Sequence, residues 1–147
     1  MTQTYTGGCQ CGQVRYAFTR DAAEAYLCHC RMCQKATGGF AAAFVQIPNG
    51  QLEWLSEPTW YASSPIAERP FCPHCGTPLG FRFKEGDGLD VTVGSLDDPA
   101  PFVPVAHYGV EALHEAWLDT STLPRHRSDE TKSVAERWNA AGLEVPE

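Results

Sequence analysis

The sequence lacks a long apolar segment, a basic leader and an excess of positive charge. Its longest apolar run, Phe40–Val45, is far shorter than the roughly 20 residues of a membrane-spanning helix. The first eight residues contain neither a basic region nor an apolar core, so we expect no signal peptide. The net charge of −7 argues against nucleic acid or an anionic membrane as the main partner. We therefore expect a cytoplasmic protein that binds neither.

Several other patterns are missing. The chain contains no internal repeat, low-complexity tract or long linker. It also contains no Ser-His-Asp pattern, phosphate-binding loop or dinucleotide-binding fingerprint. A length of 147 residues predicts a single core. The 13 Gly and 11 Pro indicate many turns and short strands rather than long helices.

Short segments of alternating or continuous apolar residues predict a mainly β fold. We expect strands over Val14–Phe18, Phe40–Ile47, Leu52–Leu55, Thr59–Ala62, Leu79–Phe83, Leu89–Val93 and Val103–Val110. The two strands that flank residues 84–88 are expected to form a hairpin. Arg31–Ala36 is expected to form a short helical turn that ends at Thr37–Gly39.

The C-terminal segment has a helical pattern instead. Ser128 resembles a helix N-cap, and acidic residues follow it in the first turn. Apolar residues then recur at helical spacing before Gly142: Val134, Ala135, Trp138 and Ala141. We expect a short terminal helix that packs on, or frays from, the β domain.

All seven cysteines fall in three tight clusters, Cys9–Cys11, Cys28–Cys33 and Cys72–Cys75. Thiols one or two residues apart are poor disulfide partners for each other, but they can chelate one metal ion. In a reducing compartment such clusters favour metal over disulfides. Seven thiols divide naturally into a closed set of four, which is typical of structural zinc, and an incomplete set of three.

The third cluster has the shape of a zinc knuckle, because two residues separate Cys72 from Cys75 and Gly76 follows. A knuckle supplies only two ligands. Cys9 and Cys11 are the natural second pair, since taking two ligands from the middle cluster would leave them with a single thiol. We predict one structural zinc on these four cysteines, which closes a loop of about sixty residues.

The remaining set, Cys28, Cys30 and Cys33, would leave the fourth position of an ion open to water, substrate or a histidine. His29 should point away from its neighbours if the local chain is extended, and His74 lies within the knuckle. Two alternatives stay open for this cluster, a second structural zinc or reduced thiols without metal.

Three ordered motifs carry a family resemblance: Gly8–Gly12, Cys28–Gly38 and Arg69–Gly76. Two later stretches, Gly94–Pro99 and Trp117–Pro124, are similar as well. Over residues 5–127 the chain resembles the glutathione-dependent formaldehyde-activating enzyme family, which also contains centromere protein V.

The resemblance implies an Mss4-like fold of twisted antiparallel sheets around zinc. It also implies the same division of the cysteines between two zinc ions. The implied activity is condensation of formaldehyde with glutathione to S-hydroxymethylglutathione, a carbon–sulfur lyase reaction. We therefore predict a zinc-binding domain over residues 1–127 and a C-terminal helical extension over residues 128–147.

A mechanism follows from the charge of the second centre. Three thiolates on Zn²⁺ leave a net charge of about −1, which suits the ion to hold a substrate thiol as thiolate. We expect that a small thiol binds there and attacks an aldehyde carbon. Cations near the clusters are candidate contacts for the carboxylates of glutathione: Arg31, Lys35, Arg69 and Arg82. Two other functions stay open, a non-catalytic zinc-stabilised binding module and a redox or zinc sensor with a labile second zinc.

Overall fold

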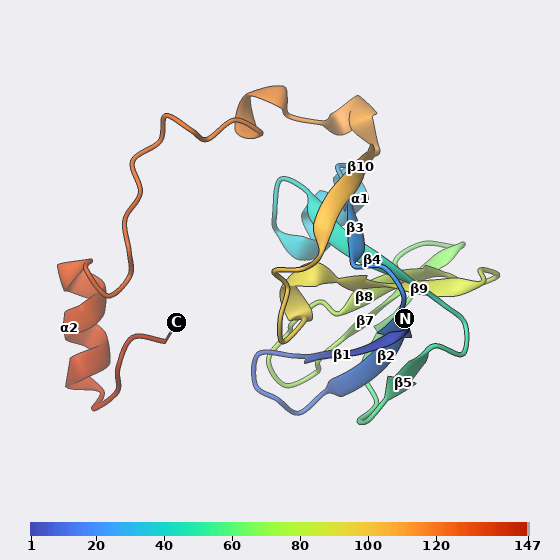
Figure 1. Cartoon of the computed structure of the whole chain (residues 1–147), viewed down its shortest axis with the longest axis horizontal. Helices are drawn as coiled ribbons and strands as arrows, with labels where there is room; N and C mark the ends of the chain where they lie inside the picture. The colour runs from blue at the N-terminus through green and yellow to red at the C-terminus, as the bar shows by residue number, and fades with distance from the viewer. Residues whose placement is uncertain (147) are drawn as a thin grey trace. The chain divides into compact units, whose positions relative to one another are not determined.

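The computed structural model describes residues 1–146, which form two compact units. Unit 1 covers Met1–His114, and unit 2 begins at Glu115. All ten strands of the described residues belong to unit 1 (Figure 1). The boundary that the sequence suggests after residue 127 stays a prediction. In the described part of the chain, no helix has the length and apolarity that a membrane crossing requires.

Unit 1 contains two sheets, which confirms the predicted mainly β class. The smaller sheet is antiparallel and has the order β1-β2-β5, with β1 (Gln3–Gly8), β2 (Arg15–Arg20) and β5 (Leu52–Trp54). The larger sheet has the order β10-β3-β4-β9-β8-β7-β6. Its strands are β3 (Glu24–Cys28), β4 (Ala42–Pro48), β6 (Thr59–Tyr61), β7 (Ala67–Phe71), β8 (Gly80–Phe83), β9 (Gly88–Thr92) and β10 (Val103–Tyr108). Its neighbouring strands pair antiparallel, except that β10 runs parallel to β3.

The seven predicted strands all exist, with ends within two residues of the expected positions, and β8 and β9 pair as the predicted hairpin. Three further strands, β1, β3 and β7, were not predicted. Adjacent glycines such as Gly7 and Gly8 favour turns, yet these two end β1. A Cβ on Gly7 would lie 2.5 Å from the Tyr16 ring, so the pairing of β1 with β2 needs glycine there. β7 contains Pro70, and proline usually argues against a strand.

Two groups of buried residues form the core of unit 1, and each contains cysteines. The larger group includes Cys9 and Cys72 together with aromatic residues of the smaller sheet. The smaller group consists of Cys33, Ala42 and Phe44. Each cysteine set is therefore anchored to a packed core through its buried members, Cys9 and Cys72 in one set and Cys33 in the other.

The described residues contain two α-helices, and a glycine follows the end of each, as predicted. α1 (Arg31–Thr37) is followed by Gly38, whose φ of +74° is left-handed and whose N–H donates to the Gln34 carbonyl. α2 (Lys132–Ala140) is followed two residues later by Gly142, with φ of +73°. Three short 3-10 helices complete the described elements: Val93–Ser95, Val110–Ala112 and Glu115–Trp117.

The start of α2 differs from the prediction. The helix begins at Lys132 with Thr131 in the N-cap position, whereas the sequence suggested Ser128. The reason is local, because Arg127 donates to both carboxylate oxygens of Asp129 at 2.9 Å. The Thr131 hydroxyl also donates to the Arg127 carbonyl at 2.7 Å. These bonds hold a turn where the first helical turn was expected.

One ion pair ties the smaller sheet to the segment after β9. Arg15 donates to the Asp97 carboxylate at 2.8 Å, and the Thr6 hydroxyl donates to it at 2.6 Å. The bond from Arg15 is the largest cause that lowers the pKa of Asp97, which falls to about 2. A depressed carboxyl pKa stabilises the fold above the ordinary value of 3.8 and ceases to do so as the pH falls through about 2. The contribution is therefore fully present at pH 7.

We expect the variant Asp97→Asn to lower the free energy of unfolding at pH 7 by no more than about 1 kcal/mol, because both charged side chains are at least one-third exposed. Urea unfolding in low and high salt would measure this. The difference from the wild-type protein should shrink in high salt, since exposed charges are screened. A difference that is independent of salt would contradict an ionic origin.

Candidate metal centres and the adjoining pocket

Among the described residues, two groups of ligand-type side chains could hold a metal ion, and both consist of cysteines. The first group is Cys9, Cys11, Cys72 and Cys75, whose sulfur atoms lie within 4.8 Å of one another. It joins the turn after β1 to the turn after β7. The structure thus brings together the two pairs of thiols that were predicted to share one zinc ion.

Each of the two turns of this first centre ends at a glycine that bonds back to the carbonyl of the first cysteine. Gly12 donates its N–H to the Cys9 carbonyl at 3.0 Å, and Gly76 donates to the Cys72 carbonyl at 2.9 Å. Both glycines have left-handed φ values, +80° and +78°. A residue with a Cβ would be strained at either position. Each turn therefore bends tightly enough for its two thiols to face one point.

The donor chemistry of the first centre fits zinc. Zinc holds thiolate sulfurs at about 2.3 Å, so four of them lie about 3.8 Å apart around the ion. The sulfur of Cys11 lies 3.4 Å from that of Cys9 and 3.8 Å from that of Cys72. Hydrogen bonds from Thr77 lower the pKa of Cys75 to about 5, which favours the thiolate that binds metal.

The second group is Cys28, Cys30 and Cys33, whose sulfurs also lie within 4.8 Å of one another. Cys28 ends β3, Cys30 is the N-cap of α1, and Cys33 lies in the first turn of that helix. The Cys33 N–H donates to the Cys30 sulfur at 3.4 Å. Burial acts to raise the pKa of Cys30. The hydrogen bonds from the Cys33 and Met32 backbone N–H groups and from the thiols of Cys28 and Cys33 outweigh burial and lower it. These hydrogen bonds favour the thiolate form of Cys30.

Arg69 lies against this second group. It is only 8% exposed, and its guanidinium donates to the Cys33 sulfur at 3.4 Å. Its charged carbon lies 4.9 Å from the centre of the Phe81 ring. Burial raises the pKa of Cys33, and Arg69 opposes that rise. A buried cation in this place offsets the negative charge of clustered thiolates.

The other predicted cations lie elsewhere. Arg31 and Lys35 are exposed on α1, and Arg31 donates to the Gln34 side chain. Arg82 pairs with Glu68 and lies over the Trp60 ring at 3.9 Å. Of the four cations only Arg69 lines the pocket beside the second cysteine group. The contacts of Arg31, Lys35 and Arg69 with substrate stay predictions.

A pocket of about 450 Å³ opens beside Cys28, Cys30 and Cys33. Its lining is dominated by large apolar and aromatic side chains: Tyr26, Met32, Phe44, Ile66, Phe81, Phe83 and Tyr108. Among the described residues, the lining contains one carboxyl group, Asp90, whose pKa burial raises to about 6. The arrangement places three potential metal ligands, one cation and one acid around an apolar space.

A histidine pair behind the cysteines was not predicted. His29 is fully buried, and its Nε2 lies 2.8 Å from Nδ1 of His107 on β10. The backbone N–H of His29 donates to the Tyr108 carbonyl at 2.8 Å. Neither His29 nor His74 belongs to the two groups of ligand atoms. Sequence alone could not find the pair, because it depends on the parallel pairing of β10 with β3 across 78 residues.

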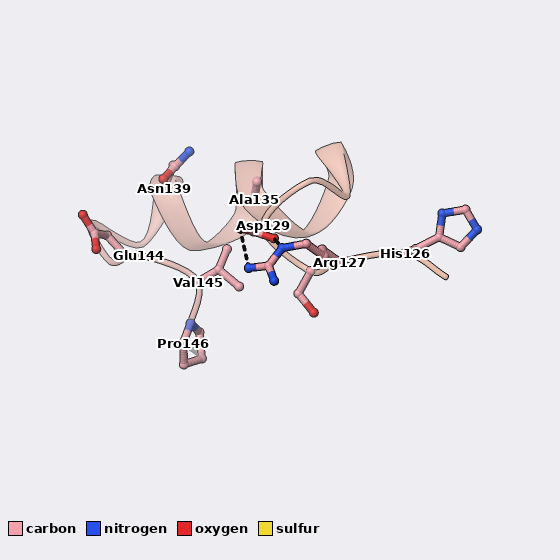
Figure 2. Close-up of a pocket in the computed structure, with 9 residues that line it drawn as sticks. His126, Arg127, Asp129, Ala135, Asn139, Glu144, Val145 and Pro146 are labelled. Carbon is pink, nitrogen blue, oxygen red and sulfur yellow. Dashed lines mark hydrogen bonds and ion pairs between the residues drawn. The ribbon is translucent and has the colours of Figure 1, made fainter. Parts of the chain in front are cut away.

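A second hollow, of about 890 Å³, lies within unit 2 and lacks a comparable set of groups (Figure 2). Its lining runs from His126 to Pro146 and is mostly exposed. The Arg127–Asp129 ion pair belongs to this lining, which contains no cysteine. The candidate site is therefore the pocket of unit 1.

Comparisons with known proteins agree with this geometry. The sequence model of the family described as "Glutathione-dependent formaldehyde-activating enzyme" matches residues 4–112. A protein of Schizosaccharomyces pombe, described as an uncharacterized lyase, is 30% identical over 82 residues, which span 56% of this chain and 60% of that relative. A crystal structure of a Rhodobacter sphaeroides protein has a similar fold, with a TM-score of 0.53 and 22% identity. That match covers 69% of this chain and 98% of the other.

Proposed function

This chain belongs to the glutathione-dependent formaldehyde-activating enzyme family, and we propose that it is a zinc-dependent enzyme that adds a small thiol to an aldehyde. The family and the lyase-named relative both support a lyase-type activity. The observation that carries the proposal is the pocket of about 450 Å³ that opens on three clustered thiols. A purely structural zinc site would not need such a pocket.

We assign two zinc ions to the chain. Cys9, Cys11, Cys72 and Cys75 would hold one as a closed structural site, while Cys28, Cys30 and Cys33 would hold the other with an open position. A zinc ion in the second site would lower the pKa of a bound thiol and so supply a thiolate nucleophile. The buried Arg69 guanidinium compensates part of the charge that three thiolates bring.

The chain's own residues then direct the addition. The apolar lining excludes water from the thiolate and positions the aldehyde carbon against the sulfur. A carbon–sulfur bond forms, the carbonyl π bond breaks, and the proton given up by the thiol ends on the carbonyl oxygen. Arg31 and Lys35, which are exposed on α1, are proposed contacts for carboxylates of a thiol that extends out of the pocket.

The proposal predicts that zinc-loaded protein accelerates the formation of S-hydroxymethylglutathione from formaldehyde and glutathione. Exchange spectroscopy with ¹³C-formaldehyde would measure the rate against the uncatalysed reaction. We expect an enhancement of at least roughly tenfold at micromolar protein, since thiol activation and positioning each contribute. A rate equal to the background would exclude this pair of substrates and favour a binding module without chemistry.

A further inference from the structure

Aromatic rings from β3, β4 and β8 of the larger sheet line the pocket beside Cys28, Cys30 and Cys33. Tyr26 on β3 and Phe44 on β4 have ring centroids 5.6 Å apart. Phe81 and Phe83 on β8 form an edge-to-face pair at 5.0 Å. All four residues line the same space of about 450 Å³. Formaldehyde has no apolar surface that could use such a lining.

Several of these apolar side chains are also unusually exposed. Phe83 is 53% exposed, Ile66 66%, Met32 48% and Tyr108 58%. Exposed large apolar side chains are unremarkable when scattered, but a group around one pocket marks a surface that a ligand covers. The lining therefore favours a ligand with an apolar body.

The few charged side chains of the pocket also favour a ligand with an apolar body. Asp90 and Arg69 are the two charged side chains in the described lining, and Arg69 is already engaged by the Cys33 sulfur and the Phe81 ring. Glutathione carries two carboxylates and an ammonium group. A molecule of that charge would lose hydration within the pocket without gaining matching partners. The charged part of any thiol must lie outside the apolar space.

We propose that the aldehyde taken by this site carries an aromatic ring, which lies against Tyr26, Phe44, Phe81 and Phe83 while the carbonyl oxygen faces Asp90. This inference rests on the proposed function and names its aldehyde. The addition of a thiol to such an aldehyde forms one carbon–sulfur bond, breaks the carbonyl π bond, and moves the thiol proton to the carbonyl oxygen. No oxidant or reductant is required.

Asp90 has the position for this contact, and its carboxyl group is mostly protonated below about pH 6. It lies on β9, opposite Gln46 of β4 and Phe81 of β8. Burial raises the pKa of Asp90 to about 6, although a hydrogen bond with Tyr26 acts in the opposite direction. The carboxyl group therefore keeps its proton to a higher pH than an exposed aspartate does. A protonated carboxyl can donate to a carbonyl oxygen, whereas a carboxylate repels it.

The test measures how fast the full-length, zinc-loaded protein adds the neutral thiol 2-mercaptoethanol to benzaldehyde and to formaldehyde. Each enzymatic rate is divided by its own uncatalysed rate. We expect the enhancement for benzaldehyde to exceed that for formaldehyde by roughly tenfold or more, because the pocket buries the ring. In Phe83→Ser the ratio should fall severalfold, and in Tyr61→Ser it should not change. Tyr61 is a matched control, since it is 62% exposed on β6 and does not line the pocket.

The outcomes separate this inference from the proposed function. If formaldehyde shows the larger enhancement, or Phe83→Ser leaves the ratio unchanged, the inference is overturned and the proposed function stands. If neither aldehyde reacts faster than background, the proposed function fails, and binding of the unreactive analogue benzyl alcohol decides the inference. Saturable NMR shifts that weaken in Phe83→Ser support an aromatic ligand, and their absence overturns it.

Discussion

Replacement of Cys72 by serine is expected to unfold unit 1 at ambient temperature or bring it close to unfolding. Cys72 is fully buried, belongs to the larger core group and lies 3.8 Å from the Cys11 sulfur. Binding of a structural zinc is part of the folding free energy of a small domain. We expect a loss of at least about 5 kcal/mol, which approaches the whole stability of many domains.

Metal analysis and thermal unfolding would measure this effect. Wild-type protein should contain two zinc ions per chain, and Cys72→Ser should lose the structural one together with the cooperative transition. Cys30→Ser is the matched control, because it also removes one thiol but from the second group. It should keep one zinc, and its unfolding temperature should lie within a few degrees of the wild-type value. Such a shift corresponds to a loss of about 1 kcal/mol of stability or less. A folded Cys72→Ser protein with two zinc ions would contradict the assignment of the first centre.

Cys30→Ser is expected to abolish the proposed activity while it preserves the fold. Cys30 is the N-cap of α1, and its sulfur accepts the Cys33 N–H. Serine is among the best N-cap residues, so the helix should begin at the same place. A hydroxyl is a far poorer zinc ligand than a thiolate, so the second zinc should be lost or held weakly.

We expect the rate of thiol addition to fall by roughly 100-fold or more, because activation of the thiol depends on the metal. The rate with 2-mercaptoethanol and an aldehyde would measure the change, and far-UV circular dichroism would check α1. Ala36→Ser provides the control on the same helix, since Ala36 is exposed and lies outside the pocket lining. Its rate with a neutral thiol should change less than about threefold, as for most surface substitutions. Full activity of Cys30→Ser would exclude a role for the second centre in catalysis.

The cysteine arrangement shows how far sequence alone can reach. The spacing of Cys72, Cys75 and Gly76 is a local pattern, and the turn that it predicts is present with its left-handed glycine. The short helix after Cys30 and its stop at Gly38 were predicted for the same reason. Each of these features depends on hydrogen bonds between residues a few positions apart.

Features that depend on distant pairing were missed. β7 was not predicted. It contains Pro70, which usually argues against a strand, yet it lies between β6 and β8 in the larger sheet. The parallel pairing of β10 with β3 brings His107 to His29, and no local pattern encodes that meeting. The start of α2 was misplaced because the pairing of Arg127 with Asp129 competes with an N-cap at Ser128.

The sequence by itself determined the mainly β class and the positions of the three cysteine clusters, because alternation and chelating spacings are properties of adjacent residues. Tertiary structure alone decided what surrounds the middle cluster. Arg69 reaches the Cys33 sulfur, and Phe81 and Asp90 reach the pocket, because β7, β8 and β9 fold beside β3 and β4. The chemistry of a site depends on such neighbours, which only folding brings together.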